Sequence, residues 1–186
     1  EKEAVMSITR NKDDVGQRTY AVERAPTQVA PYIWAVTRIA LGWVFLWAFL
    51  DKTFGLGYAT PAENAWIDGG SPTSGFLGNV EGPFADLFQG LANNAFVDWL
   101  FMLALLGIGL AFILGIGMRI AAASAVVLLV LMWMAVLPIV NNPFLDDHLV
   151  YALVAVGLAA SNAGDTWGFG KAWASTHLVT RYPILR

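Results

Sequence analysis

The sequence predicts an all-α integral membrane protein: a bundle of four transmembrane helices with a long outer loop that contains short helices. Three observations support this fold class. Of the 186 residues, 57% are hydrophobic and 13% are charged, whereas soluble domains carry about 25% charged residues. The apolar residues are gathered into four segments rather than spread along the chain. Between the first two segments lies a long stretch, 51–98, with aromatic residues and turn residues.

The first three apolar segments, 32–50, 99–117 and 120–140, each hold about 20 residues, enough for a helix to cross the roughly 30 Å hydrocarbon core. Arg38 is the only charged residue within them. Lipid offers no hydrogen-bond partners to the backbone, so these segments are predicted to be helices. Glycines such as Gly109 and Gly115 predict close helix packing within the bundle, with a dimer interface as the alternative.

The fourth segment is purely apolar only from residue 149 to residue 160. Alone it is too short to cross a bilayer, but a helix over 144–163 would be long enough. That extension brings Asp146, Asp147 and His148 into the membrane-spanning region. Ionisable groups at such depth are costly and often functional.

The basic residues predict the orientation. Of the 11 Lys and Arg residues, five precede residue 31, Arg119 lies between the second and third segments, and three follow residue 163. The outer loop holds only Lys52. We therefore expect a multi-pass protein of a prokaryotic cell membrane with two cytoplasmic tails, 1–30 and 164–186.

Two short helices are predicted in the outer loop. In "TPAENAWIDGG", Thr60 is a candidate N-cap, followed by Pro61 at the first helical position and Glu63 three residues after the cap. In "GPFADLFQGLANN", one apolar helical face is expected to pack on the bundle or lie in the interface. Its members are Phe84, Leu87, Phe88 and Leu91.

Several chemistries lack their residues in this chain. It has no cysteine and two histidines, His148 and His177, which are predicted on opposite sides of the membrane. A shared haem and thiolate metal sites are therefore excluded, and no HExxH, Walker loop or GxGxxG motif occurs. We expect no covalent cofactor and no metal. The net charge of −3 does not suggest a nucleic-acid partner.

The polar residues at the outer end are the candidates for catalysis. Asp147, His148 and Lys52 could relay protons to a quinone, with Tyr151 on the same helical face as Asp147. The competing interpretation is structural: acids favour the first turn of a helix, and Lys52 with Asp147 would form an ion pair in a partly buried recess.

Arg38 lies about two helical turns from the cytoplasmic end of the first segment. It either snorkels to the headgroups or serves as a buried hydrogen-bond donor to a quinone carbonyl. Trp43, Trp47 and Trp133 are expected in the core, although aromatic side chains also line quinone pockets. Arg38, Tyr151 and Trp47 are thus the candidate cofactor-binding residues.

Four stretches together resemble the DoxX/DoxD family of small four-helix membrane proteins over about residues 31–170. They are "RIALGWVFLWAFLDKTFG", "WIDGGSPTSGFLG", "LLGIGLAFILGIGMRIAA" and "NNPFLDDHLVYALVAVGLA…AGDTWGFG". The resemblance implies a relation to the large subunit of a thiosulfate:quinone oxidoreductase, or to parts of membrane redox and oxidative-stress assemblies. Matched by motif, it also points to Arg38, Lys52, Asp147 and His148.

Two functions follow from these observations. In the first, the chain is an accessory subunit of a larger respiratory or redox complex, with other membrane subunits and lipid as partners. In the alternative, it is a quinone-linked oxidoreductase subunit. The lack of cofactor ligands favours the first function, and the polar groups at membrane depth favour the second.

Overall fold

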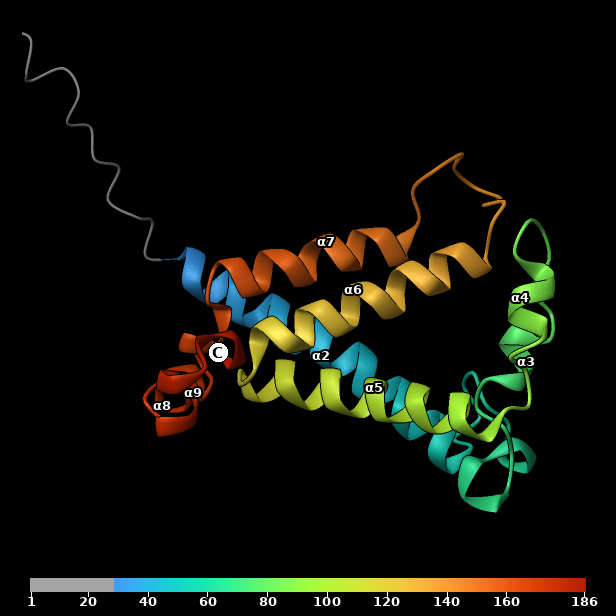
Figure 1. Cartoon of the computed structure of the whole chain (residues 1–186), viewed down its shortest axis with the longest axis horizontal. Helices are drawn as coiled ribbons and strands as arrows, with labels where there is room; N and C mark the ends of the chain where they lie inside the picture. Colours follow the sequence, from blue (N-terminus) through green and yellow to red (C-terminus); the bar gives the residue numbers. More distant parts are fainter. Residues whose placement is uncertain (1–28) are drawn as a thin grey trace, which may run out of the picture. The chain divides into compact units, whose positions relative to one another are not determined.

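The computed structural model describes residues 29–186, and the predicted cytoplasmic tail 1–30 lies almost wholly outside the described residues. The unit Pro31–Arg186 is helical, with no strand among the described residues, as the sequence predicts (Figure 1). It has four longer helices, with short helices and 3-10 turns between the first two and after the fourth. The longer helices are α2 (Ala30–Phe54), α5 (Ala95–Leu114), α6 (Met118–Ala135) and α7 (Asp147–Ala160).

Helices α2, α5 and α6 are long and apolar enough to cross a membrane, whereas α7 is shorter. The prediction of a helix over 144–163 was wrong at both ends. Asp146 is the N-cap of α7, with extended backbone angles, and its Oδ1 accepts from the Leu149 amide at 3.2 Å. This cap fixes the start of the helix at Asp147. The helix ends before Asn162, which adopts a left-handed conformation.

The bounds of the other helices also differ from the predicted segments, for local reasons. Helix α5 starts at Ala95 because the Asn94 side chain accepts from the amides of Phe96 and Val97. It ends at Gly115, which has a left-handed conformation (φ 73°). Helix α6 ends at Ala135, shortly before Pro138, since a proline disfavours helix in the residue before it.

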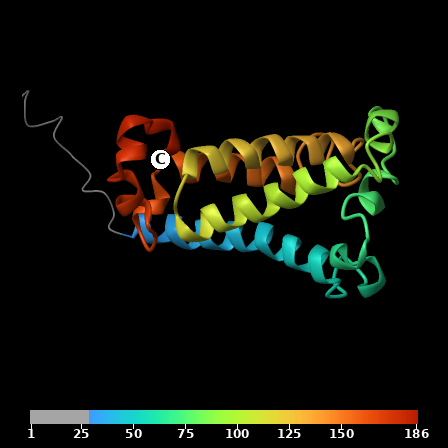
Figure 2. The same ribbon diagram turned by 60° about the horizontal axis from the view of Figure 1, so that its bottom comes forward.

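One hydrophobic core draws side chains from α2, α5, α6 and α7, which run side by side in Figures 1 and 2. Phe45 of α2 meets Phe112 of α5 edge-on, with ring centroids 6.3 Å apart. Helices α2 and α5 approach closely at Gly109. A Cβ added to this glycine would lie only 2.8 Å from the backbone nitrogen of Leu46. Close packing at Gly109 is therefore confirmed.

The segment between α2 and α5 contains η1 (Ala62–Asn64), η2 (Trp66–Asp68), α3 (Ser74–Leu77) and α4 (Ala85–Gln89). We call this end of the unit the loop end. The single helix expected after Thr60 is instead two 3-10 turns, η1 and η2. Of the predicted apolar face around α4, Phe84, Phe88 and Leu91 pack in a small second core, while Leu87 is 56% exposed.

Residues 164–186, predicted as a cytoplasmic tail, contain short helices and fold against the start of α6. They include α8 (Gly170–Ala174) and α9 (His177–Arg181), between the 3-10 turns η3 (Ala163–Asp165) and η4 (Pro183–Leu185). The Arg119 amide donates to the carbonyl oxygen of Arg186 at 2.9 Å. We call this end of the unit the Arg38 end.

Candidate functional site

The structure places the six predicted site residues at opposite ends of the unit. Arg38 lies near the start of α2, at the Arg38 end. The other five lie in the half of the unit near the loop end. They are Trp47 and Lys52 in the second half of α2, and Asp147, His148 and Tyr151 in the first turns of α7. A single site containing all six residues is therefore not formed.

Arg38 is fully buried (0% exposed) and binds the protein's own backbone. Its Nη1 donates to the carbonyls of Phe112 and Ile113, the latter at 2.8 Å. Its Nη2 donates to those of Trp167 at 2.8 Å and Thr166 at 3.3 Å. Both terminal nitrogens are thus engaged, and only Nε lacks a partner. Snorkelling is contradicted, and no Nη group is left for a quinone carbonyl.

The Phe112 and Ile113 carbonyls belong to the last turn of α5, where a helix has no backbone partners for its C=O groups. A guanidinium there also complements the negative end of the helix dipole. Arg38 therefore joins α2, α5 and the segment after η3 into one junction, which we call the Arg38 junction.

Glycines make room for this junction. A Cβ on Gly115 would lie 2.9 Å from the Cα of Gly164 and 3.0 Å from Nη1 of Arg38. A Cβ on Gly168 would lie 3.0 Å from Nη2. The stretches "LLGIGLAFILGIGMRIAA" and "AGDTWGFG", distant in sequence, thus meet around Arg38. Sequence reasoning identified both stretches but not their shared partner.

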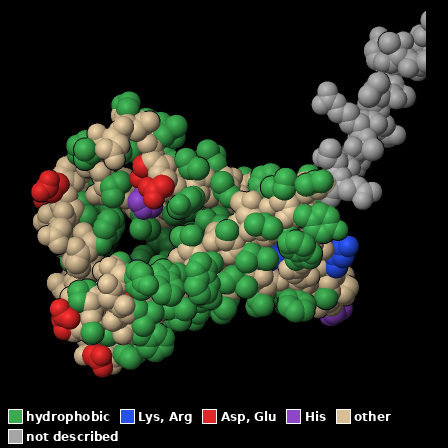
Figure 3. All heavy atoms as spheres, turned by 180° about the vertical axis from the view of Figure 1, so that it is seen from behind, with side chains coloured by type: hydrophobic (Ala, Val, Ile, Leu, Met, Phe, Trp, Pro, Cys, Tyr) green, Lys and Arg blue, Asp and Glu red, His purple; other side chains and the backbone are tan. Residues whose placement is uncertain are grey.

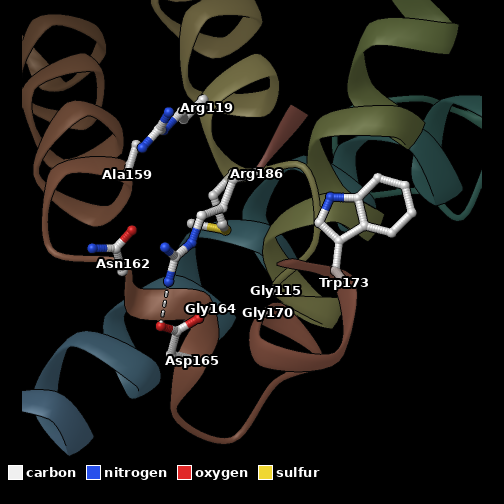
Figure 4. Close-up of a pocket in the computed structure, with 10 residues that line it drawn as sticks. Gly115, Arg119, Ala159, Asn162, Gly164, Asp165, Gly170, Trp173 and Arg186 are labelled. Carbon is white, nitrogen blue, oxygen red and sulfur yellow. Dashed lines mark hydrogen bonds and ion pairs between the residues drawn. The ribbon is translucent and has the colours of Figure 1, made fainter. Parts of the chain in front are cut away.

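A small pocket lies beside the junction, with a volume of about 10 Å³, which is room for roughly one water molecule. Arg186 reaches toward Asp165 across it, with an Nη2–Oδ2 distance of 2.8 Å (Figure 4). Sequence reasoning missed this ion pair, because the two residues belong to a segment predicted to be a tail. The pocket is too small for an organic ligand.

At the loop end, His148 lies closest to Asp146, a residue that was not among the predicted site residues. Nδ1 of His148 lies 2.6 Å from Oδ2 of Asp146 and 3.6 Å from Oδ1 of Asp147. The side chains of His148 and Asp146 are 16% and 11% exposed, whereas that of Asp147 is 69% exposed. The predicted Lys52–Asp147 pair is wrong: no ion pair of Lys52 occurs among the described residues.

The Asp146, Asp147 and His148 ligand atoms lie within 4.8 Å of one another. Carboxylate and imidazole groups at this spacing are of the kind that bind divalent cations. Asp146 and His148 already have a local role, because Asp146 caps α7 and its Oδ2 lies within hydrogen-bond distance of Nδ1 of His148. The expectation that the chain binds no metal stays a prediction.

Trp47 and Tyr151 do not share a site either. Tyr151 is half-buried against the main core. Trp47 packs between Trp43 and Tyr58, with centroid distances of 5.8 and 5.1 Å. Trp43 is 50% exposed, so its predicted core position was wrong. Trp43 and Trp47 belong to α2, and Tyr58 lies just beyond its end.

Two buried carboxylates hold the loop end in place. Asp51 accepts from the amides of Tyr58 at 3.2 Å and Ala59 at 2.9 Å. Oδ1 of Asp98 accepts from the Thr73 amide at 3.1 Å, the Thr73 hydroxyl at 2.6 Å and the Ser71 hydroxyl at 3.0 Å. Both acids thus anchor the loop to α2 and α5.

An apolar pocket with room for a ligand lies at the loop end, with a volume of about 600 Å³. Small-molecule sites are typically 300–1,000 Å³ and mostly apolar. Helices α5 and α6 form its walls, and α3 and the α4 region border it. Lys52 is its one charged residue. The lining is Lys52, Pro72, Thr73, Phe76, Leu77, Phe88, Leu91, Val97, Leu100, Phe101, Ala104, Ala123, Ser124, Val127, Leu128, Leu131 and Met132.

Comparisons with protein-family models, with curated proteins and with solved structures find no match to this chain. The resemblance to the DoxX/DoxD family therefore stays a prediction from the sequence motifs.

Proposed function

We propose that the chain is a four-helix, multi-pass membrane protein, similar to the DoxX family, which serves as an accessory subunit of a larger respiratory or redox membrane complex. The observation that carries the accessory role is the use of Arg38. The most deeply buried charged side chain binds four backbone carbonyls and supports the fold rather than a ligand.

The membrane location is supported by three apolar helices of sufficient length and by the large hydrophobic side chains that they expose, such as Trp43, Leu103 and Val127. A lipid environment suits such surfaces, whereas water does not. Helix α7 is proposed as a fourth crossing because it shares the core with the other three. Its shortness would be met by local thinning of the bilayer.

The orientation is supported by the charges of the described residues. Five of the six basic residues there belong to the Arg38 end, and only Lys52 to the loop end. Figure 3 shows the same division, with Lys and Arg side chains at one end and acidic ones at the other. By the positive-inside rule the Arg38 end, and with it both termini, faces the cytoplasm.

The accessory role is supported further by the loop end. A proton relay needs its groups within hydrogen-bond reach of one another. Lys52 and Asp147 form no ion pair, and the Asp147 side chain is exposed. The one close pair, Asp146 with His148, belongs to the N-cap of α7. The partners that we propose are other membrane subunits and lipid.

A quinone-linked oxidoreductase subunit is the second candidate function, and one observation favours it. The apolar pocket of about 600 Å³ beside Lys52 has the size and character of a site for a lipophilic molecule. The quinone would be bound without covalent attachment, and a partner would supply electrons.

The topology is tested by cysteine labelling, because the chain contains no cysteine. Glu81→Cys at the loop end should react with a membrane-impermeant maleimide in intact cells. Lys171→Cys at the Arg38 end should react only after the membrane is opened. The reverse pattern would refute the orientation, and reaction of both in intact cells would refute the membrane location.

The function is tested by purification of the chain in a mild detergent from its native membrane. The accessory role predicts that redox subunits co-purify in a fixed ratio and that the isolated chain does not reduce a quinone analogue. An isolated chain that carries quinone and reduces a dye would establish the oxidoreductase instead.

A further inference from the structure

Lys52 has an unusual position for the one basic residue at the loop end. It lies in the last turn of α2 and lines a pocket whose other residues are uncharged. No Lys or Arg occurs between Arg38 and Arg119 apart from Lys52. This single cation therefore borders the apolar pocket of about 600 Å³ at the loop end.

Lys52 forms no ion pair among the described residues, and Asp51 is the one carboxylate whose charge acts on it from nearby. Their ion pairs are His148 with Asp146 and Asp147, and Arg186 with Asp165. The neighbouring carboxylate of Asp51 accepts from two loop amides. An ammonium group that is half-buried beside apolar walls gains from an anionic partner, because burial removes part of its hydration.

The shape of the pocket suits a hydrocarbon chain. Its walls are aliphatic and aromatic side chains of α5 and α6, such as Leu100, Phe101 and Leu128, with Phe76 and Phe88 from the loop. Figure 3 shows hydrophobic side chains along the helices and a hollow beside the loop segments. Since Lys52 is near the end of α2, it lies at the level where a bilayer places its headgroups.

We propose that this pocket binds an anionic phospholipid, with the phosphate head at Lys52 and one acyl chain between α5 and α6. A neutral ligand would fill the apolar space but leave the ammonium group with no ion-pair partner beyond the charge of Asp51, which is held by two loop amides. The inference rests on the proposed membrane location, but it does not depend on the accessory role, because binding concerns the purified chain alone.

The test is native mass spectrometry of the delipidated full chain in detergent, titrated with phosphatidylglycerol or with phosphatidylcholine of the same acyl chains. The wild type should bind the first lipid at least about fivefold more tightly, as expected for one lysine beside an anionic head. Lys52→Met should abolish the preference and Lys52→Arg should keep it. Lys171→Met, a matched loss of charge at the other end, should change nothing.

A second variant examines the pocket itself. Ala104→Phe places a large side chain in the space and should weaken binding of both lipids, with folding checked by circular dichroism. Should that variant fail to fold, the comparison of Lys52→Met with Lys52→Arg still decides the assignment of the head. Equal binding of the two lipids by the wild type, or a preference that survives Lys52→Met, would overturn the proposal.

Oleate and a neutral long-chain quinone are included as competitors. Displacement of phosphatidylglycerol by oleate at equal concentration would assign the anionic site to free fatty acids, and displacement by the quinone would assign the pocket to quinone. Either result overturns the phospholipid. If Glu81→Cys and Lys171→Cys show the predicted labelling but the chain has no lipid preference, only the lipid proposal is refuted, and the proposed membrane location is not.

Discussion

The two cations of α2 have opposite surroundings although they belong to the same helix. Arg38 is fully buried and its Nη groups donate to four carbonyls. Lys52 is half-buried, borders an apolar pocket and has no ion pair among the described residues. A charge within an apolar segment therefore indicates a ligand only when the fold itself leaves that charge unmatched.

The Arg38 junction and the pocket beside Lys52 differ in the same way. At the junction, backbone segments approach so closely that only glycine fits at Gly115 and Gly164, and the pocket beside it has about 10 Å³. A separate apolar groove of about 630 Å³ lies between α6 and α7 next to Arg119, and the pocket that α5 and α6 border beside Lys52 has about 600 Å³. The packed junction supports the fold, whereas the pocket beside Lys52 has room for a ligand.

The largest expected effect comes from removing the Arg38 side chain. Arg38→Met should lower the free energy of unfolding by about 3 kcal/mol or more, because buried carbonyls of Phe112, Ile113 and Trp167 lose their donor. The measurement is denaturation by SDS in mixed micelles, followed by circular dichroism. The matched control Arg181→Met removes an exposed cation and should cost less than about 0.5 kcal/mol.

Lysine at this position sharpens the test. An ammonium group is a compact charge and lacks the planar fork that reaches two pairs of carbonyls. Arg38→Lys should therefore recover less than half of the loss. Equal stability of Arg38→Met and the wild type would mean that Arg38 does not hold the junction together.

The glycines provide the second test. Gly115 and Gly117 both have positive φ, 73° and 59°, but only Gly115 is crowded. Gly117→Ala should cost about 1 kcal/mol for the left-handed backbone. Gly115→Ala should cost about 2 kcal/mol more, because the new Cβ meets Gly164 and Arg38. Equal losses in thermal unfolding would show that the close approach is not maintained in solution.

At the loop end, the buried anchor should matter more than the exposed acid. Asp98→Ala removes the acceptor of three hydrogen bonds from Ser71 and Thr73 and should cost about 2 kcal/mol. It should also speed proteolysis of the loop. Asp147→Ala, whose side chain is mostly exposed, should change stability by less than about 0.5 kcal/mol. A larger effect of Asp147→Ala on either measure would contradict this order.

Sequence patterns predicted the helices well because long apolar runs leave the backbone no alternative in lipid. They predicted helix ends less well, because the ends depend on single residues such as Asn94, Gly115, Pro138 and Asp146. A cap acts through one side-chain hydrogen bond or one backbone angle, which the pattern of hydrophobic residues does not reveal.

The candidate site was harder to predict, because it depends on which distant residues meet. The sequence identified Arg38 and the "AGDTWGFG" stretch as unusual, but not that they bind each other across more than 120 positions of the chain. It paired Lys52 with Asp147 from an assumed helix over 144–163. The cap at Asp146 shortens that helix, leaves Asp147 exposed and directs His148 to Asp146.

The smallest expected effect is also the one that separates the two interpretations of Lys52. If Lys52 formed a buried pair with Asp147, Lys52→Met would cost a few kcal/mol and Asp147→Asn would restore much of it. Since the two side chains form no ion pair, we expect instead that Lys52→Met changes the unfolding free energy by less than about 0.5 kcal/mol. The two changes should then be additive within about 0.5 kcal/mol, as for residues without a shared partner.

A double-mutant cycle in lipid-free micelles measures the coupling free energy between Lys52→Met and Asp147→Asn. A coupling above about 1 kcal/mol would place the two side chains in contact and remove the main reason to regard Lys52 as a binding residue. Added phosphatidylglycerol should stabilise the wild type but not Lys52→Met, since a ligand that binds only the folded state raises its stability in proportion to occupancy.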